Sequence, residues 1–341
     1  MANTDPKAEA PPHARLMEMV MAQWTSRLLH LTVQMELADR LAEGSRTAEE
    51  LAQSTAANAH ALYRVMRTLA SLGLFTEDSA HRFSLTPLSE ALRSGIPGSF
   101  RSAVLLLGRD TSAMSLNHLL YSVQTGKSGF EKAFGMPFFE WLATHPAQAS
   151  MFSESMVSFH GAEPAAVATA YDFSQFKTVV DVGGATGNLL TAILARHPGS
   201  RGILFDRPHV VCDAPALIQD RGLGDRIEIE AGSFFESVPA GGDAYLLSHI
   251  IHDWSEAQCL TVLANCRQAM KPGSRLLIIE MVLPNGDAPH VGKMLDIVML
   301  AIGGQERTEA EYRTLLDRAG FRLARVVPTE SAVSIVEAFP A

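Results

Sequence analysis

Short apolar runs alternate with amphipathic stretches through the second half of the chain, from Tyr171 to the C-terminus. Runs of about four to six Val, Ile, Leu and Phe residues are typical of buried parallel strands. Their alternation with helical patterns predicts an α/β fold, a parallel sheet covered by helices. The predicted strands lie at residues 179–182, 202–205, 227–230, 244–247 and 276–279.

The pattern changes at the C-terminal end. A helix is predicted around residues 308–319, followed by two strands at 322–327 and 332–337. Only a short turn separates these two strands, and a parallel return would need a crossover. The chain is therefore expected to finish in an antiparallel hairpin.

The first ordered segment, residues 15–42, is apolar around most of its helical circumference. A helix of this kind is buried on several sides. Two interpretations are open: a helix enclosed by its own domain, or a helix at a subunit interface. We favour the interface.

Residues 45–94 have the pattern of a winged helix. Thr47 and Glu50 form a capping box, Asn58 can cap a second helix, and apolar residues flank a polar turn between 74 and 85. In a regulator the helix bearing His60, Arg64 and Arg67 would enter the major groove of DNA. So few basic residues in an acidic chain favour a structural or dimerising module instead.

Residues 100–165 are predicted to be mostly helical, with their densest aromatic cluster at 134–141. Spaced aromatic and methionine side chains usually form a core. The alternative is a wall over a flat aromatic ligand.

Composition narrows the class of protein. The net charge of the 341 residues is −9, which argues against nucleic-acid binding, and the three cysteines have no metal-ligand spacing. Residues 1–14 are a predicted disordered lead-in without the features of a signal peptide, and no apolar run reaches membrane-spanning length. A cytoplasmic protein with reduced thiols, without a membrane or nucleic-acid partner, is expected.

A glycine turn follows the first predicted strand, with Gly183, Gly184 and Gly187 within five residues. Such a turn opens the cofactor crevice of a doubly wound sheet. Asp206 ends the second strand 23 residues after Gly183, where a carboxylate can accept hydrogen bonds from ribose hydroxyls or, alternatively, cap a helix. No Lys-Ser/Thr pair follows the glycines, so a P-loop is excluded, and the hairpin ending favours S-adenosylmethionine over a dinucleotide.

The fourth and fifth strands end near His252 and Glu280, which are therefore expected beside the same crevice. An imidazole there can serve as a general base. A metal site of His249, His252 and Asp253 is less favoured, because residues spaced by three at a strand-to-helix turn need not converge. No metal is predicted.

Five segments together resemble the S-adenosylmethionine-dependent O-methyltransferases of plant phenylpropanoid and bacterial aromatic-polyketide pathways. The resemblance covers nearly the whole chain and rests on residues 181–187, 205–208, 252–255, 280–284 and 303–308. It implies a Rossmann-like class I methyltransferase sheet, preceded by a helical, winged-helix dimerisation domain. The implied division is 15–165 for the dimerisation and substrate-lid domain and 166–341 for the catalytic domain, assembled as a homodimer.

The resemblance also implies a role for each site residue. His252 is the expected base, flanked by Glu280 and Glu306. The residues expected to bind the cofactor are Gly183, Gly184, Asp206, Ser233, Phe234 and Ser248. Those expected to contact the acceptor are Met156, His160, Asp296 and Met299.

Three positions depart from the family pattern. Ala185 replaces a frequent glycine and should be tolerated if its φ is negative. Ser233 stands where many relatives have Asp, and Ser248 where the plant enzymes have Lys. The expected reaction is methyl transfer to a hydroxyl of a small aromatic metabolite, leaving S-adenosylhomocysteine. The alternatives are a non-methylating relative, such as a decarboxylase or hydroxylase, and a winged-helix ligand sensor.

Overall fold

The computed structural model describes residues 11–341, which fall into two compact units. One comprises the chain up to Ala113 together with Leu142–Phe159, and the other comprises Met114–Trp141 with His160–Ala341. None of the described helices combines the length and apolar character needed to cross a bilayer.

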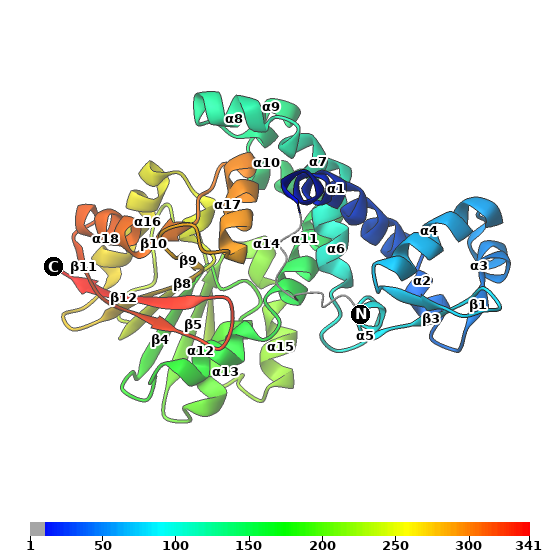
Figure 1. Cartoon of the computed structure of the whole chain (residues 1–341). Helices are drawn as coiled ribbons and strands as arrows, with labels where there is room; N and C mark the ends of the chain where they lie inside the picture. The colour runs from blue at the N-terminus through cyan, green and yellow to red at the C-terminus, as the bar shows by residue number, and fades with distance from the viewer. Residues whose placement is uncertain (1–10) are drawn as a thin grey trace, which may run out of the picture. The chain divides into compact units, whose positions relative to one another are not determined.

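The N-terminal unit contains the predicted winged helix (Figure 1). Antiparallel strands pair in the order β1-β3-β2, and helices precede and follow them. The capping box of Thr47 and Glu50 and the Asn58 cap are confirmed, and a further helix starts at Pro87. Its elements are α1 (Pro12–Gln34), α2 (Leu37–Arg40), β1 (Arg46–Thr47), α3 (Ala48–Thr55), α4 (Ala59–Ser71), β2 (Phe75–Glu77), β3 (Arg82–Leu85), α5 (Pro87–Glu90), α6 (Arg101–Gly108) and α11 (Pro146–Phe159), with α7 (Asp110–Leu116) at its edge.

Helix α1 carries an apolar surface that the single chain leaves open. Leu16, Met19 and Trp24 are each more than half exposed, at 62%, 62% and 56%. Near the C-terminal end of the same helix, Val33 is buried in the core of the winged helix. Helix α1 already begins at Pro12, so only residues 1–10 of the predicted 1–14 lead-in lie outside the described residues.

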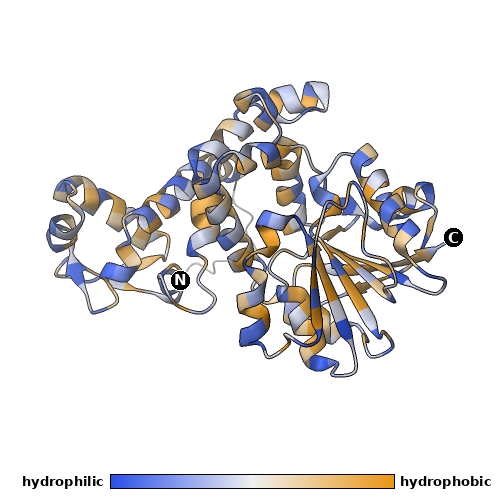
Figure 2. Ribbon diagram, turned by 180° about the vertical axis from the view of Figure 1, so that it is seen from behind, coloured by the Kyte–Doolittle hydropathy of each residue, from blue (hydrophilic) through white to orange (hydrophobic). Residues whose placement is uncertain are grey.

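The second unit is built on a sheet whose strands, within the described chain, follow the order β11-β12-β8-β7-β4-β5-β6 (Figure 1). The five predicted parallel strands and the antiparallel hairpin are confirmed. The central strands are the most apolar part of the unit (Figure 2), and Val180, Leu246 and Ile278 are fully buried. The strands are β4 (Thr178–Val182), β5 (Arg201–Asp206), β6 (Ile227–Ala231), β7 (Ala244–Ser248), β8 (Arg275–Glu280), β11 (Phe321–Pro328) and β12 (Ser334–Pro340).

Helices follow the strands as the alternating pattern predicts. They are α12 (Glu163–Ala170), α13 (Asn188–Arg196), α14 (Pro208–Val211), α15 (Ala214–Asp220), α16 (Glu256–Ala269), α17 (Val291–Ile302) and α18 (Glu309–Arg318). A short parallel pair, β9 (Val282–Leu283) with β10 (Arg307–Thr308), brings the segment after α17 back to the end of β8. This pairing positions Glu306 near Glu280.

The compact units divide the chain differently from the predicted boundary at residue 165. Helices α8 (Leu119–Thr125) and α9 (Gly129–Phe134) group with the sheet, because they pack on α17. The Ser128 hydroxyl, for example, donates to the Ala301 carbonyl at 3.1 Å. The sequence between these partners is too long for a local pattern to reveal the contact.

The aromatic cluster predicted at 134–141 forms a core. Phe138 and Trp141 lie on α10 (Phe138–Ala143), and both are buried together with Phe130. Their ring centroids are 5.1 Å and 5.7 Å, respectively, from that of Phe130. Phe139 instead packs against Trp254, with centroids 5.2 Å apart. Most of the cluster is therefore structural, and one ring reaches a segment beside the predicted site.

Candidate active site

The glycine turn after β4 leaves no room for side chains. Gly183 has φ +75°, and a Cβ there would overlap the Ile250 side chain and lie 3.4 Å from the Phe234 ring. The Gly183 amide donates to the Phe205 carbonyl at 2.7 Å, which fixes the turn against the end of β5. Two predicted cofactor residues, Gly183 and Phe234, are thus neighbours.

Ala185 has φ +50°, not the negative value on which its tolerance was predicted to depend. That conformation is strained for an L-residue with a Cβ. The reason is visible in the turn: the Ala185 amide donates to Asp206 Oδ2 at 2.9 Å, and this bond holds the backbone in place. The departure from glycine therefore costs conformational energy.

Asp206 lies at the end of β5, beside the glycine turn. Its Oδ1 accepts from the Arg207 amide at 2.7 Å, and burial raises its pKa. Helix α14 has Arg207 as its N-cap, without a side-chain capping bond, so Asp206 does not cap that helix. The carboxylate is fixed in orientation by two backbone amides at the crevice.

Asp181, near the end of β4 and just before the glycine turn, was not among the predicted binding residues. It is buried, and within residues 11–341 neither oxygen accepts a hydrogen bond of good geometry. The Leu190 amide has only a minor, lowering effect on its pKa. Burial and, secondarily, the charge of Asp206 raise its pKa to about 7. A Cβ at Gly184 would come within 2.6 Å of this carboxyl, so only glycine lets the turn pack directly against it. An acid inside an otherwise apolar strand was the sequence signal.

Aromatic rings gather beyond β6. Phe234 and Phe235 each lie 4.8–6.0 Å, centroid to centroid, from their ring neighbours in a cluster with Trp254. The buried Trp254 Nε1 has no hydrogen-bond partner in the described chain. Ser233 uses its hydroxyl to accept from the Phe235 amide at 3.3 Å, which shapes this turn, and Ser248 ends β7.

His252 is the centre of the second group of residues. It lies in a single 3₁₀ turn (Ile251–Asp253) directly after β7, and its Nδ1 is 2.7 Å from Glu306 Oε1. The backbone around this pair is tied together, because the Gln305 amide donates to the His252 carbonyl at 2.7 Å. A Cβ at Gly304 would overlap that carbonyl, so glycine permits the close approach.

Glu280 contacts the backbone of His252 rather than its imidazole. Its Oε1 accepts from the His252 backbone amide at 3.1 Å, and the Tyr312 hydroxyl donates to its Oε2. Glu280 thus fixes the turn that carries the imidazole, whereas Glu306 orients the ring itself. Tyr312, fully buried on α18, was not predicted.

The charges around His252 decide its protonation. Burial alone would lower its pKa, but the negative charges of Asp253, Glu306 and Glu280 outweigh burial and raise it to about 10. The Asp253 carboxyl lies 3.6 Å from His252 Nε2, and burial raises its own pKa to about 7. The site therefore holds a strongly basic imidazole within a cluster of acids.

This constellation matches a known family in both halves of the chain. Residues 116–322 match the O-methyltransferase domain, and residues 17–95 match the O-methyltransferase dimerisation domain. The chain belongs to the O-methyltransferase family.

Relatives of this methyltransferase are similar over nearly their full length. The phenazine O-methyltransferase PhzM of Lysobacter antibioticus is 43% identical over 341 residues, which is 100% of each chain. The phenazine-1-carboxylate N-methyltransferase of Pseudomonas aeruginosa is 32% identical over 317 residues, 92% of each. The crystal structure of NcsB1, an O-methyltransferase from neocarzinostatin biosynthesis in complex with S-adenosylmethionine and 2-hydroxy-5-methyl naphthoic acid, is 32% identical, with a TM-score of 0.82 over 93% of this chain and 96% of that one.

The residues of this methyltransferase fit the family's cofactor, S-adenosylmethionine. The buried Asp181 carboxyl, which has no hydrogen-bond partner within residues 11–341, suits the positively charged methionine portion. Asp206 suits a ribose diol and the rings near Trp254 suit adenine.

The residues predicted for acceptor binding separate into three sets. Asp296 on α17 accepts from the Glu306 amide at 2.8 Å, so it supports the backbone of Glu306, while Met299 lies buried on the same helix. His160 lies next to Glu163 and His249, which sequence reasoning had not connected to it. Met156 lies on α11 in the other compact unit, and its role in acceptor binding stays a prediction.

Proposed function

We propose that the protein transfers the methyl group of S-adenosylmethionine to a hydroxyl of a small aromatic metabolite, with His252 accepting the proton of that hydroxyl. The observation that carries the proposal is the buried His252–Glu306 pair at 2.7 Å. Because Nδ1 faces Glu306, Nε2 is the nitrogen that exchanges a proton with the acceptor.

The basicity of His252 suits a phenol. A phenol has a reference pKa of about 10, and the pKa of His252 is raised to about 10. Proton transfer between groups of matched pKa is close to balanced, so the imidazole can take the phenolic proton as the oxygen becomes nucleophilic. At neutral pH most of the imidazole is protonated, so activity should increase toward alkaline pH.

The reaction balances without a further reactant. The cofactor supplies a sulfonium methyl group that needs no additional activation. The acceptor oxygen forms the new bond to the methyl carbon as the carbon–sulfur bond breaks, giving the methyl ether and S-adenosylhomocysteine. His252 takes the proton and later releases it to solvent. No metal is proposed for methyl transfer.

The roles of the other residues follow from their contacts. Glu306 orients and charges the imidazole, and Glu280 holds its backbone. Asp206, Gly183, Gly184, Phe234 and Ser248 are proposed to bind the cofactor, with Asp181 added to this set. Ser233 is proposed both to shape the adenine turn, where its hydroxyl accepts from the Phe235 amide, and to donate its O–H to the cofactor.

Nitrogen is a second possible acceptor atom, because one relative is a phenazine-1-carboxylate N-methyltransferase. A ring nitrogen with a free lone pair needs no base, whereas a phenol does. The His252–Glu306 pair therefore favours oxygen. Its acids and base also favour methyl transfer over decarboxylation or hydroxylation, and the acidic chain gives no support to a DNA-binding regulator.

Two candidate acceptors, assayed separately, test the proposal. The protein is incubated with methyl-labelled S-adenosylmethionine and either 1-hydroxyphenazine or phenazine-1-carboxylate, and the products are assigned by mass spectrometry and NMR. Label on oxygen of the hydroxy compound supports the proposal. Label exclusively on ring nitrogen, or cofactor binding without transfer to any of a panel of hydroxyphenazines and hydroxynaphthoates, contradicts it.

A further inference from the structure

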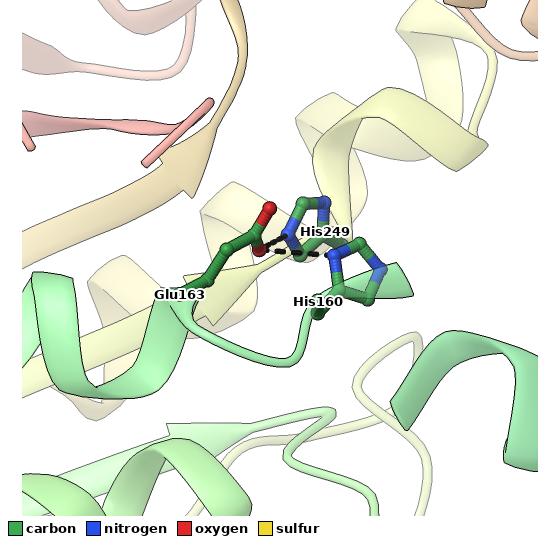
Figure 3. Close-up of side chains that lie close together, drawn as sticks. All are labelled: His160, Glu163 and His249. Atoms are coloured by element: carbon green, nitrogen blue, oxygen red, sulfur yellow. Dashed lines mark hydrogen bonds and ion pairs between the residues drawn. The ribbon is translucent and has the colours of Figure 1, made fainter. Parts of the chain in front are cut away.

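Two imidazoles outside the His252–Glu306 pair converge on one carboxylate oxygen (Figure 3). Glu163 Oε2 lies 2.9 Å from His160 Nδ1 and 2.8 Å from His249 Nε2. The two imidazole rings lie 3.8 Å apart, centroid to centroid. All three atoms that could ligate an ion lie within 4.8 Å of one another.

The fold brings these residues together from two segments that are far apart in sequence. His160 lies in the turn between α11 and α12, and Glu163 is the first residue of α12. His249 directly follows β7. Its backbone has φ +53°, a left-handed conformation that is strained for a residue with a side chain. Both segments belong to the same compact unit.

We propose that His160 Nδ1, His249 Nε2 and Glu163 Oε2 form a binding site for a zinc-class divalent transition-metal ion. Two imidazoles with one carboxylate are a ligand set that suits zinc and its neighbours rather than magnesium or calcium, which prefer oxygen ligands. A small movement of the side chains would place all three atoms about 2.0–2.2 Å from one ion, the distances usual for zinc.

A hydrogen-bonded cluster without metal is the competing explanation. In that case each histidine only donates to Glu163, and replacing Glu163 by Gln would keep an oxygen acceptor in place. A metal site depends instead on the carboxylate charge and on both imidazole nitrogens. The two explanations therefore differ in what Glu163→Gln does to metal binding.

The ion would bind close to the proposed catalytic residues, and none of them would be its ligand. The His249 and His252 rings are 5.3 Å apart, and His252 keeps Glu306 as its own partner. The site would join the start of α12 to the end of β7. It is independent of the proposed methyl transfer, which needs no metal.

The test is direct metal binding by the full-length protein, prepared without a polyhistidine tag and stripped with a chelator. Co²⁺ is added as a spectroscopic probe, and Zn²⁺ is titrated by calorimetry and by displacement of Co²⁺. We expect about one ion per chain, visible d–d absorption typical of a low-coordinate site, and loss of that absorption when Zn²⁺ is added.

Variants identify the ligands. His249→Ala, His160→Ala and Glu163→Gln should each lower Zn²⁺ affinity by more than about 100-fold, above the range seen for residues that only support a ligand. The control is His60→Ala, which removes an exposed histidine from α4 and should bind Zn²⁺ normally. Circular dichroism checks that each variant is folded.

Two results would overturn the proposal. One is the absence of stoichiometric Co²⁺ and Zn²⁺ binding by the unmodified protein, which needs no variant to interpret. The other is unchanged affinity in a folded Glu163→Gln or His249→Ala variant. Neither result bears on methyl transfer, which is measured separately in the presence of a chelator.

Discussion

Nδ1 of His252 lies 2.7 Å from Oε1 of Glu306, and both side chains are buried. The contact spans 54 residues of sequence and is held by backbone bonds on both sides. It makes Glu306, rather than Glu280, the carboxylate that orients the imidazole.

Glu306→Gln should lower kcat and shift the pH profile. Removing the carboxylate charge lowers the pKa of His252, so the rise of kcat with pH should occur at lower pH than in the unmodified protein. Stopped assays between pH 6 and 10.5 measure both effects. Glu309→Gln, an exposed neighbour on α18, is the matched control and should keep the original profile. An unshifted profile in Glu306→Gln would separate Glu306 from the basicity of His252.

Asp181→Asn should stabilise the cofactor-free protein while weakening cofactor binding. The pKa of Asp181 is raised to about 7, so its burial costs stability that grows as the pH rises from the unfolded-state pKa of about 4 through the folded value. At pH 8 the neutral amide should raise the free energy of unfolding by about 1–3 kcal/mol. Denaturation and calorimetry with S-adenosylhomocysteine give the two quantities.

The comparison variant for Asp181→Asn is Asp206→Asn, whose carboxylate already accepts two backbone bonds. It should weaken S-adenosylhomocysteine binding without the gain in stability. Loss of stability in Asp181→Asn at pH 8, with unchanged affinity for S-adenosylhomocysteine, would remove Asp181 from the proposed cofactor site.

Ala185→Gly should stabilise the protein. Relief of the left-handed strain should stabilise the folded protein by about 1–2 kcal/mol. The greater freedom of glycine in the unfolded chain should destabilise it by about 0.5–1 kcal/mol. The net gain of roughly 0.5–1 kcal/mol should be visible in chemical denaturation. Ala185→Val, with a β-branched side chain at the same φ, should destabilise. Equal stability of the Gly and Val variants would show that the turn is not strained.

The local patterns predicted most of the fold. The strands were visible because each is a short apolar run, and the caps at Thr47 and Asn58 because capping depends on residues close in sequence. The φ of Ala185 could not be predicted, since it is imposed by Asp206 from the neighbouring strand. In the same way, sequence predicted that Glu280 and Glu306 flank His252, but the pairing of β9 with β10 decides which of them reaches the imidazole.

We expect the homodimer to form through the exposed apolar face of α1. Light scattering at micromolar concentration should give about twice the 36.9 kDa chain mass. Trp24→Glu combined with Leu16→Glu should weaken the dimer, because two charges would be buried on a surface that is otherwise apolar. Glu18→Gln, on the same helix, serves as the control. A stable monomer of the unmodified protein at this concentration would contradict the interface.

The measurement that tests the central claim most directly is the turnover of His252→Ala on a series of phenolic acceptors of decreasing pKa. Loss of a general base should reduce kcat by roughly 10²–10⁴-fold for an ordinary phenol, with little change in S-adenosylhomocysteine affinity. The defect should shrink as the acceptor pKa falls, because a more acidic phenol ionises without help. Near-normal turnover of the variant, or an equal loss for acidic and non-acidic acceptors, would contradict proton removal by His252.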